Sequence, residues 1–493
     1  MATFDVEYDL VVVGGGGSGK MAAYIGAKEG GLATALLEKA PETGGSSVFA
    51  EGQAAFESSE QLARKTPPTP GMHYPSRAEG YKRYIDYSHK RANPDVVRMQ
   101  VTHTAETIDI MKSLGIVYTD VTIYAYEQPT ELNSFHRPDG LGAHMQEVLL
   151  QATVDAGVDI FTSTPAKQLI VEDGKVVGVI AEDADGKTIR IGAKAVVLAG
   201  GGFGGNLDMV RAHSRFARNA DALIYMGPEP NTGDTINMAL AIGADTWEMQ
   251  PLMLVPVAKD KSLVAHINGG GSQPVLWVNK TGQRYYDEHV ALSFADAANV
   301  IAIQPGGASY SIMDQATVQH LIDDGSDIGL GDFVKYHLPL TGLQTELDEA
   351  VAEGDMAWKA DSIPELAEAI GLDPEVFTAT VALYNEFAED GDDPLFYKDA
   401  KYLRPVKTAP FYAIEMRAAI LVSVGALRVN GDLQVIGVDA KPIEGLYAVG
   451  MDAGGLFGDT YNLDVPGTAN GFAHASGRVA ARHAIGAIKA AAV

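Results

Sequence analysis

The stretch Tyr8–Gly19, YDLVVVGGGGSG, decides the fold of this chain. Its apolar first half predicts a buried parallel strand, and the glycines that follow predict a tight turn into a helix. Gly14, Gly16 and Gly19 have the spacing G-x-G-x-x-G. In this motif the first glycine makes the turn, the second lets the backbone approach a pyrophosphate, and the third lets helix and strand pack closely. The pattern therefore predicts a dinucleotide site.

The residues that follow support the same prediction. A second short apolar strand, residues 34–37, ends in Glu38, where a carboxylate is suited to hold a ribose 2′-hydroxyl and to repel the 2′-phosphate of NADP. The helix that begins near Ser18 offers free N–H groups to the phosphates. No second glycine triplet both follows a strand and opens a helix, and we interpret Gly269–Gly271, in NGGGSQ, as a loop. We therefore expect no separate NAD domain.

Composition limits the classes of function. The chain has 493 residues, enough for two or more domains, and a net charge of −27, which disfavours nucleic acid and anionic membranes as partners because both require a basic surface. It has no cysteine, so redox chemistry requires an organic cofactor, and its histidines show no metal-ligand spacing. No segment is long and apolar enough to span a bilayer and no leader is evident, so we expect a cytoplasmic protein without membrane insertion.

Several motifs occur in the same order as in one flavoprotein family. They are the opening glycine turn, the pair Glu38-Lys39, the loop Gly44–Ser47, HRPDGLG from His136, a second glycine turn at Gly200–Gly202, TGDTINMALAIGA from Thr232, VNKTGQRYYDE from Val278 and GLYAVGMDAGG from Gly445. With these motifs the chain resembles the FAD-dependent fumarate reductases and 3-ketosteroid dehydrogenases over most of its length.

This resemblance implies the fold. We expect an α/β protein with a Rossmann-like FAD-binding domain in two chain segments, residues 1–240 and 411–493, interrupted by an α+β capping domain at residues 241–410. The capping segment has helix signals of its own, since Ser362 precedes Pro364 and Glu365 as an N-cap, a first-turn proline and a capping-box acid do. A further apolar helical period runs from Val376 to Phe387.

The resemblance also implies the cofactor. The covalent-FAD form of the family carries a histidine just after the Gly-Gly-Ser loop, and this chain has SSVFAEGQ there, so we expect non-covalent FAD. The expected cofactor-binding positions are Gly14, Gly16, Gly17, Ser18, Gly19, Glu38, Lys39, Gly45, Ser46, Ser47, Gly52, Lys167, Gly200, Gly201, Asp234, Asp452, Thr468 and Ala469.

Little of the family's dicarboxylate clamp is present. Val255 and Val422 occupy the positions of its two histidines, and Tyr461-Asn462 lie where its carboxylate-binding arginine is expected. In such a pocket both carboxylates of bound fumarate lack a cationic partner, and burying them unpaired costs on the order of several kcal/mol. Fumarate and succinate are therefore disfavoured as substrates.

The resemblance implies four catalytic candidates. Arg284 matches the family's proton donor, although arginine is a weak acid and a structural ion pair with Asp287 or Glu288 is the alternative. Tyr461 matches the tyrosine with which ketosteroid dehydrogenases bind a ketone, and its phenol can stabilise an enolate as an oxyanion hole does; the alternative is a core tyrosine. Tyr286 and His136 are further candidates, and Tyr124 and Tyr126 are possible neighbours of the flavin.

These observations favour an enzyme, an FAD-dependent oxidoreductase that acts on a carbon–carbon bond conjugated to a carbonyl by hydride transfer at flavin N5. An enone reductase and a ketosteroid-type dehydrogenase both fit. Two alternatives stay open: a reductase of a monocarboxylic enoate, held by Arg137 or Arg284, and a flavoprotein that only carries electrons. The substrate is expected to be a small molecule. The electron donor or acceptor and the direction of the reaction stay open.

Overall fold

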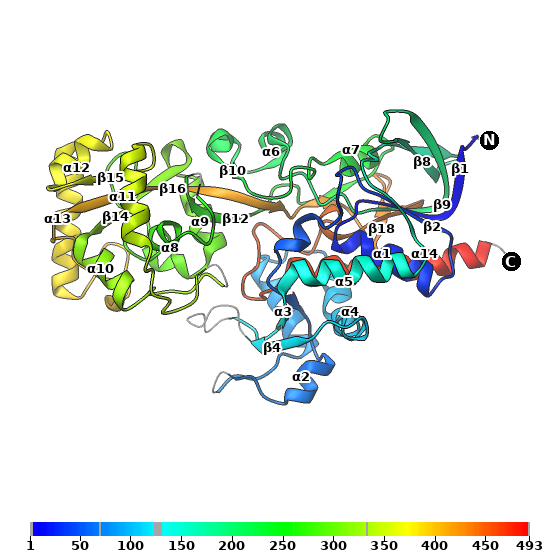
Figure 1. Ribbon diagram of the computed structural model, residues 1–493, viewed down its shortest axis with the longest axis horizontal. Coiled ribbons are helices and arrows are strands. Elements are labelled where there is room, and N and C mark those ends of the chain that lie inside the picture. The colour runs from blue at the N-terminus through cyan, green and yellow to red at the C-terminus, as the bar shows by residue number, and fades with distance from the viewer. Residues whose placement is uncertain (1–2, 69–70, 123–130, 260, 332–333, 492–493) are drawn as a thin grey trace.

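The computed structural model describes residues 3–68, 71–122, 131–259, 261–331 and 334–491. It is an elongated α/β molecule in which both ends of the chain lie at the same end (Figure 1). Within these residues no helix has both the length and the hydrophobicity of a membrane-spanning segment.

The first sheet contains the predicted dinucleotide unit. Strand β1 (Val6–Val13) pairs in parallel with β2 (Thr34–Leu37) on one side and with β9 (Thr188–Leu198) on the other. The buried faces of β1 and β2 consist of aliphatic side chains, which is why these strands form the centre of the sheet. The sheet is completed by β6 (Asp159–Phe161), β7 (Ala166–Glu172), β8 (Lys175–Glu182), β18 (Gln434–Ile436) and β19 (Pro442–Ala448).

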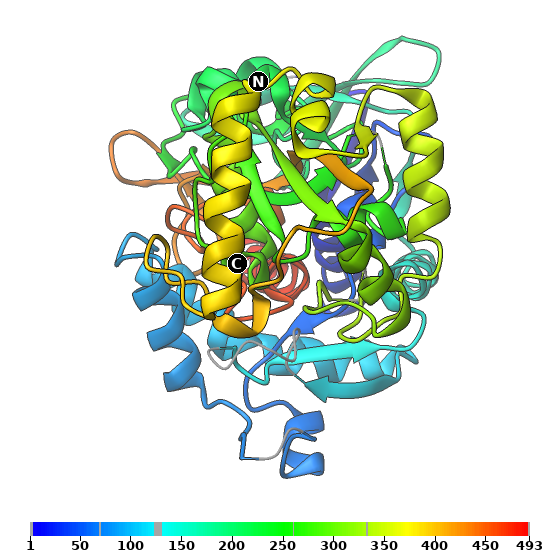
Figure 2. The same cartoon turned by 90° about the vertical axis from the view of Figure 1, so that its left-hand side faces the viewer.

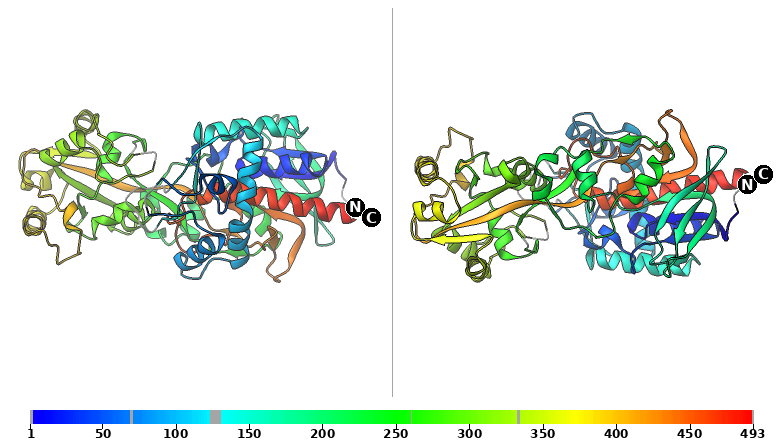
Figure 3. Two further views of the ribbon diagram at one scale, coloured as in Figure 1. Left: turned by 90° about the horizontal axis from the view of Figure 1, so that it is seen from below. Right: turned by 90° about the horizontal axis from the view of Figure 1, so that it is seen from above.

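Helix α1 (Gly17–Lys28) follows β1 and packs along the C-terminal helix α14 (Thr468–Ala491), as Figure 3 shows. The two helices touch closely because Gly477 has no side chain: a Cβ there would lie 2.2 Å from the carbonyl oxygen of Ser18. The N-terminal half also contains α2 (Ser59–Arg64), α3 (Arg77–Tyr87), α4 (Pro94–Ser113), α5 (Leu141–Asp155), α6 (Leu207–His213), α7 (Asp234–Leu240) and the small sheet β3 (Gln53–Ala54), β5 (Phe135–Pro138), β4 (Tyr118–Thr122).

The second sheet is built around one long strand, β16 (Phe411–Ser423), which runs through the middle of the molecule (Figure 1). It pairs with β10 (Ile224–Tyr225), β12 (Leu252–Ala258), β14 (Ala308–Asp314) and β15 (Ala357–Ala360), and β13 (Leu276–Asn279) pairs with β14. Figure 2 shows this part end-on; its helices are α8 (His266–Gly271), α9 (Phe294–Ala302), α10 (Gln315–Asp323), α11 (Leu343–Glu353), α12 (Ile363–Ala369) and α13 (Pro374–Asp390). Strands β11 (Thr246–Trp247) and β17 (Ala426–Leu427) form a separate pair.

The α/β fold class predicted from the sequence is confirmed. The predicted chain division at 410/411 falls at the start of β16, inside the second sheet, and this sheet takes strands from residue 224 to residue 423. The exact domain limits stay a prediction.

Two local expectations have different outcomes. The N-cap expected before α12 is confirmed, because the Ser362 side chain accepts a hydrogen bond from the Glu365 N–H. The loop expected at Gly269–Gly271 is wrong, since these residues form the end of α8. The helix packs closely at Gly271, where a Cβ would lie 2.6 Å from the Met416 sulfur.

Candidate active site

A groove of about 340 Å³ lies at the carboxyl ends of β1 and β2. In parallel α/β sheets this is the edge at which dinucleotides bind. Its walls come from the glycine turn after β1, the loop after β2 and the second glycine turn after β9. Of the predicted cofactor-binding residues it is lined by Gly14, Gly16, Gly17, Ser18, Glu38, Lys39, Gly45, Ser46, Ser47, Gly200, Gly201 and Asp234.

The first glycine turn has the geometry that the motif requires. Gly14 has a φ of +111°, and a Cβ on it would lie 2.2 Å from the carbonyl oxygen of Ala199. A Cβ on Gly19 would lie 1.9 Å from the carbonyl oxygen of Gly14. Gly16 differs, because the nearest neighbour of a Cβ there would be 3.9 Å away, at ordinary van der Waals distance, and this glycine lines the groove. It is also the N-cap of α1, with no side-chain cap and no acid in the first turn, and the N–H groups there suit a pyrophosphate.

Glu38 lies in the wall of the groove and is buried. Its carboxylate accepts hydrogen bonds from the Gly15 N–H at 2.7 Å and the Ala40 N–H at 2.8 Å, which fix its orientation. Each carboxylate oxygen has further acceptor capacity, which suits ribose hydroxyls. Beside it the Lys39 ammonium donates to Thr232 and Asp234, both at 2.6 Å. The groove therefore fits the phosphates and ribose of FAD, which would be held by the glycine turn and Glu38.

Several predicted residues lie behind or beside the groove. Asp452 is buried and accepts hydrogen bonds from the N–H groups of Gly200 and Gly202, and its burial raises its pKa. It shapes the second glycine turn rather than the groove wall. Thr468 is buried and bonded to Tyr84. Lys167 forms an ion pair with Glu182, whereas its neighbour Ala166 lines the groove, so the sequence prediction was displaced by one residue.

A second cavity, of about 440 Å³, adjoins the groove. The two share Ser46, Ser47, Phe49, Pro228, Met451 and Ala473 as lining residues. Most other walls of the second cavity are apolar. They come from β5 and the segment before α14 (Phe135, Leu463 and Pro466) and from the second sheet with its adjoining segments (Met253, Leu263, Phe294, Leu421 and Val422). The predicted residues Gly52 and Ala469 also line this cavity. We call it the substrate cavity.

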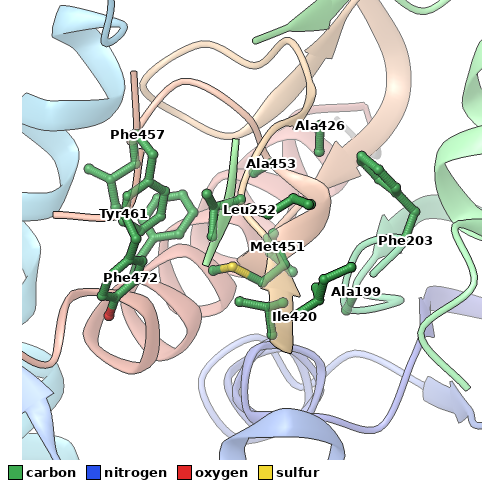
Figure 4. Close-up of a cluster of buried hydrophobic side chains, with 14 of the residues drawn as sticks. Ala199, Phe203, Leu252, Ile420, Ala426, Met451, Ala453, Phe457, Tyr461 and Phe472 are labelled. Carbon is green, nitrogen blue, oxygen red and sulfur yellow. The ribbon is translucent and has the colours of Figure 1, made fainter. Parts of the chain in front are cut away.

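Tyr461 lies in the wall of the substrate cavity, and only 4% of its surface is exposed. Its ring stacks on Phe457 with centroids 5.2 Å apart, next to Met451 and Phe472 (Figure 4). Its hydroxyl oxygen accepts a hydrogen bond from the Ala469 N–H at 3.4 Å, at the start of α14. Burial, with a smaller contribution from the charge of Glu51, raises its pKa to about 12, so the phenol stays protonated at neutral pH and can donate.

Arg284 does not contribute to the lining of either cavity. Its guanidinium is buried between two carboxylates, with bonds to Glu288 at 2.7 and 2.8 Å and to Asp393 at 2.7 Å, and it packs on the rings of Tyr384 and Phe396. Burial alone lowers the pKa of Arg284, but these ion pairs raise it above its usual value. These contacts are those of the structural ion pair that the sequence offered as the alternative, with Glu288 as one partner, and the role of Arg284 as proton donor stays a prediction.

The other catalytic candidates are also away from the cavity walls. His136 is buried, with its Nε2 bonded to Ser58 Oγ at 2.6 Å and its Nδ1 to the carbonyl oxygen of Ser134 at 2.8 Å, and burial lowers its pKa to about 4. It supports β5, whose Phe135 lines the cavity. Tyr286 is 44% exposed and lines neither cavity. Tyr124 and Tyr126 lie outside the described residues.

Three polar residues of the substrate cavity were missed in the sequence: Glu51, Ser262 and Asn470. Glu51 is buried in the cavity wall, just after the Gly-Gly-Ser-Ser loop. Asn470 donates to the Gly52 carbonyl oxygen at 3.2 Å, and its own amide oxygen has no hydrogen-bond partner among the described residues. The available signal was a single acid in the otherwise small and apolar stretch SSVFAEGQAAF.

Comparisons with known proteins agree with this geometry. The profile of the FAD binding domain family matches residues 9–464. The vinyl phenol reductase of Lactiplantibacillus plantarum is 34% identical over 490 residues, which cover 97% of this chain and 96% of that protein. The NADH:fumarate oxidoreductase of Klebsiella pneumoniae is 27% identical over 459 residues, which cover 92% of this chain but 45% of that protein.

A solved structure, the 3-ketosteroid delta1-dehydrogenase from Sterolibacterium denitrificans, has the same fold with a TM-score of 0.78 at 22% identity, covering 98% of this chain and 100% of that one. The family resemblance inferred from the motifs is thereby confirmed. The chain belongs to the FAD binding domain family, and it is an FAD-dependent oxidoreductase.

Proposed function

We propose that this enzyme reduces a carbon–carbon double bond in an uncharged, largely apolar substrate, and that the double bond is conjugated to a hydroxyaryl ring, as in vinyl phenol. The observation that carries the proposal is the substrate cavity, which adjoins the FAD groove, has mostly apolar walls and includes the phenol of Tyr461. The relative that matches almost the whole chain is named as a vinyl phenol reductase.

The charges of the cavity argue against carboxylate substrates. Among the described residues that line it there is no lysine, arginine or histidine, and the one ionisable group besides Tyr461 is Glu51. At a separation of ~5 Å and an effective dielectric constant of ~20, two carboxylates repel by about 3 kcal/mol. Fumarate and monocarboxylic enoates would therefore bind poorly, which disfavours the enoate reductase considered from the sequence.

FAD, when bound, supplies the hydride. The chain's own residues bind the substrate and stabilise the negative charge that develops on it. Tyr461 donates a hydrogen bond to the substrate oxygen on which negative charge develops, in the manner of an oxyanion hole. The apolar walls lower the local dielectric constant, which strengthens this interaction. Gly467 and Ala469, at the start of α14, lie beside the same cavity, where the positive end of the helix dipole favours negative charge.

An enone is the second candidate substrate. Tyr461 supports it, because a phenol donates equally well to a ketone oxygen. A flavoprotein that only carries electrons is disfavoured, since a largely apolar cavity beside the flavin site suits a small-molecule substrate.

The test is the rate at which reduced enzyme is reoxidised. The holoenzyme is reduced with dithionite and mixed anaerobically with 4-vinylphenol, 2-cyclohexenone, crotonate or fumarate, while the flavin absorbance is followed. We expect 4-vinylphenol to react fastest and both carboxylates slowest. Fastest reaction with fumarate or crotonate refutes the proposal, and a faster reaction with the enone transfers the assignment to the second candidate. If no compound reoxidises the flavin, the electron carrier is favoured.

A further inference from the structure

Glu51 is an unusual residue for the wall of an apolar cavity. It follows the 3-10 helix η1 (Gly45–Phe49) and precedes β3, and 9% of its surface is exposed. The neighbouring residues of this segment, from Ser46 to Gly52, contribute small or apolar groups to the same wall. Glu51 and Tyr461 are the ionisable side chains among the described residues that line the cavity.

These two groups have complementary hydrogen-bonding roles. The Tyr461 hydroxyl oxygen accepts from the Ala469 N–H, and its own proton can still be donated to a ligand. An ionised carboxylate only accepts hydrogen bonds. A donor and an acceptor in one cavity match a hydroxyl group, which both accepts and donates. A ketone oxygen only accepts, and so matches Tyr461 but not the Glu51 carboxylate.

We propose that Glu51 is a catalytic acid–base residue that takes the phenolic proton of a hydroxyaryl alkene and later returns it. The proposal rests on the function proposed above, and it assigns to Glu51 the selection of hydroxyaryl alkenes over both enones and carboxylates. Tyr461 has a separate role, because it donates to the same oxygen while that oxygen is negatively charged or part of a carbonyl.

The proton path balances the reduction. The phenolic O–H bond breaks and its proton moves to the Glu51 carboxylate, while the terminal carbon of the vinyl group takes a proton from water; the ring becomes a quinone methide with no net oxidation or reduction. The benzylic carbon then accepts a hydride, which is one proton with two electrons. Reduced FAD is the reductant in this step. The resulting phenolate recovers the proton held by Glu51. The net change is one hydride and one proton added across the double bond.

The first test measures binding and needs no turnover. Oxidised holoenzyme is titrated with the product 4-ethylphenol and with 4-ethylanisole, which lacks the phenolic proton. We expect 4-ethylphenol to bind as the neutral phenol, with its hydroxyl donating a hydrogen bond to Glu51. We also expect its dissociation constant to be at least about tenfold lower than that of 4-ethylanisole. Equal affinities for the two compounds in the wild type overturn the proposal.

The second test compares variants. In Glu51→Gln the preference for 4-ethylphenol should shrink to about twofold or less, whereas Glu51→Asp should retain part of it. Glu60→Gln removes a carboxylate that pairs with Arg64 and Lys112 outside the cavity, so it serves as the matched control and should behave as wild type. A Glu51→Gln variant with bound FAD and an unchanged preference for 4-ethylphenol overturns the role of Glu51. If Glu51→Gln does not retain FAD, Glu51→Asp and the wild-type titration decide.

The third test uses single turnover of the wild type. Reduced holoenzyme should be reoxidised by 4-methoxystyrene at least about 100-fold more slowly than by 4-vinylphenol, because the methyl ether has no proton for Glu51 to take. Similar rates overturn the acid–base role while leaving the proposed function intact. If 4-vinylphenol itself fails to reoxidise the flavin while the enone succeeds, the proposed function has failed instead.

Discussion

Replacing Tyr461 by phenylalanine removes one hydroxyl group and little else. The ring stacks on Phe457 with centroids 5.2 Å apart and an interplanar angle of 22°, and phenylalanine keeps this contact. The hydrogen bond that is lost within the protein is the one from the Ala469 N–H, which is long at 3.4 Å. The substitution therefore separates the chemistry of the phenol from the packing of the ring.

The expected effects on catalysis and on stability differ in size. Loss of a donor to a developing oxyanion costs about 10²- to 10³-fold in kcat, equivalent to about 2.7–4 kcal/mol. Loss of the hydrogen bond to Ala469 costs at most about 1 kcal/mol of stability, because a neutral hydrogen bond contributes about that much and this one is long. FAD content should stay unchanged, since Tyr461 lines the substrate cavity and not the FAD groove.

Tyr84→Phe is the matched control. Tyr84 is also buried, and its hydroxyl forms a 2.7 Å hydrogen bond with Thr468, the first residue of α14, but it does not line the substrate cavity. This variant should lose about 1 kcal/mol of stability and keep wild-type turnover. The assay for both variants is anaerobic stopped-flow reoxidation of the reduced flavin by 4-vinylphenol, together with urea unfolding. If Tyr461→Phe reacts within about threefold of the wild type, or if Tyr84→Phe is equally slow, the oxyanion role of Tyr461 is wrong.

Three further predictions concern the cofactor, the ion-pair network and the buried histidines. Glu38→Ala should raise the dissociation constant of FAD by about 10- to 100-fold, because a charged hydrogen-bond partner of the ribose contributes about 1.5–3 kcal/mol; quenching of flavin fluorescence measures it, and unchanged affinity contradicts the assignment. Arg284→Met should lower the free energy of unfolding by about 3–5 kcal/mol, since it leaves the Glu288 and Asp393 carboxylates buried without that cation, while Arg428→Met, which breaks the partly exposed pair with Asp245, should hardly change it. Holoenzyme of Arg284→Met that is folded but catalytically dead would show instead that the arginine acts in the reaction. His136 and His474 each have a pKa that burial lowers to about 4, so the folded protein binds fewer protons than the unfolded chain between about pH 4 and about pH 6.5. Stability should therefore be complete above about pH 6.5 and fall by about 3 kcal/mol per histidine as the pH drops to about 4; His136→Gln should reduce this slope by half in urea unfolding, and an unchanged slope is the contrary result.

The fold and the FAD groove could be predicted because their signals are local. The turn at Gly14 requires a residue without a side chain, and the position of Glu38 is fixed by the length of one βαβ unit. Twelve of the predicted cofactor-binding residues line the groove for this reason. Asp452, which lies outside it, holds the backbone of the second glycine turn in place instead of forming the wall.

The substrate cavity was less predictable because its walls are assembled from distant segments. A motif in the sequence does not show which way a side chain points, and Arg284 turns away from the cavity toward Asp393, 109 residues later in the chain. His136 and Phe135 are neighbours on β5, and alternation along a strand places only Phe135 in the cavity wall. Glu51 belongs to no motif, and its role in the cavity depends on the apolar side chains that other segments of the chain place around it.

The polar and the apolar walls of the cavity have different roles in the proposed function. The polar groups select the substrate by its charge, and the apolar residues set its size and shape. Glu51 lies just before β3 of the small sheet and Tyr461 in the segment before α14, while Met253, Leu421 and Val422 come from the second sheet. The polar pair therefore stays next to the flavin groove, whichever apolar residues the second sheet presents. Substitutions in the second sheet should then change the size and shape of the accepted substrate, whereas preference for a hydroxyl over a carboxylate should change with Glu51. Because β16 supplies Leu421 and Val422 and also pairs with four strands of its sheet, it couples any displacement of that sheet to the width of the cavity.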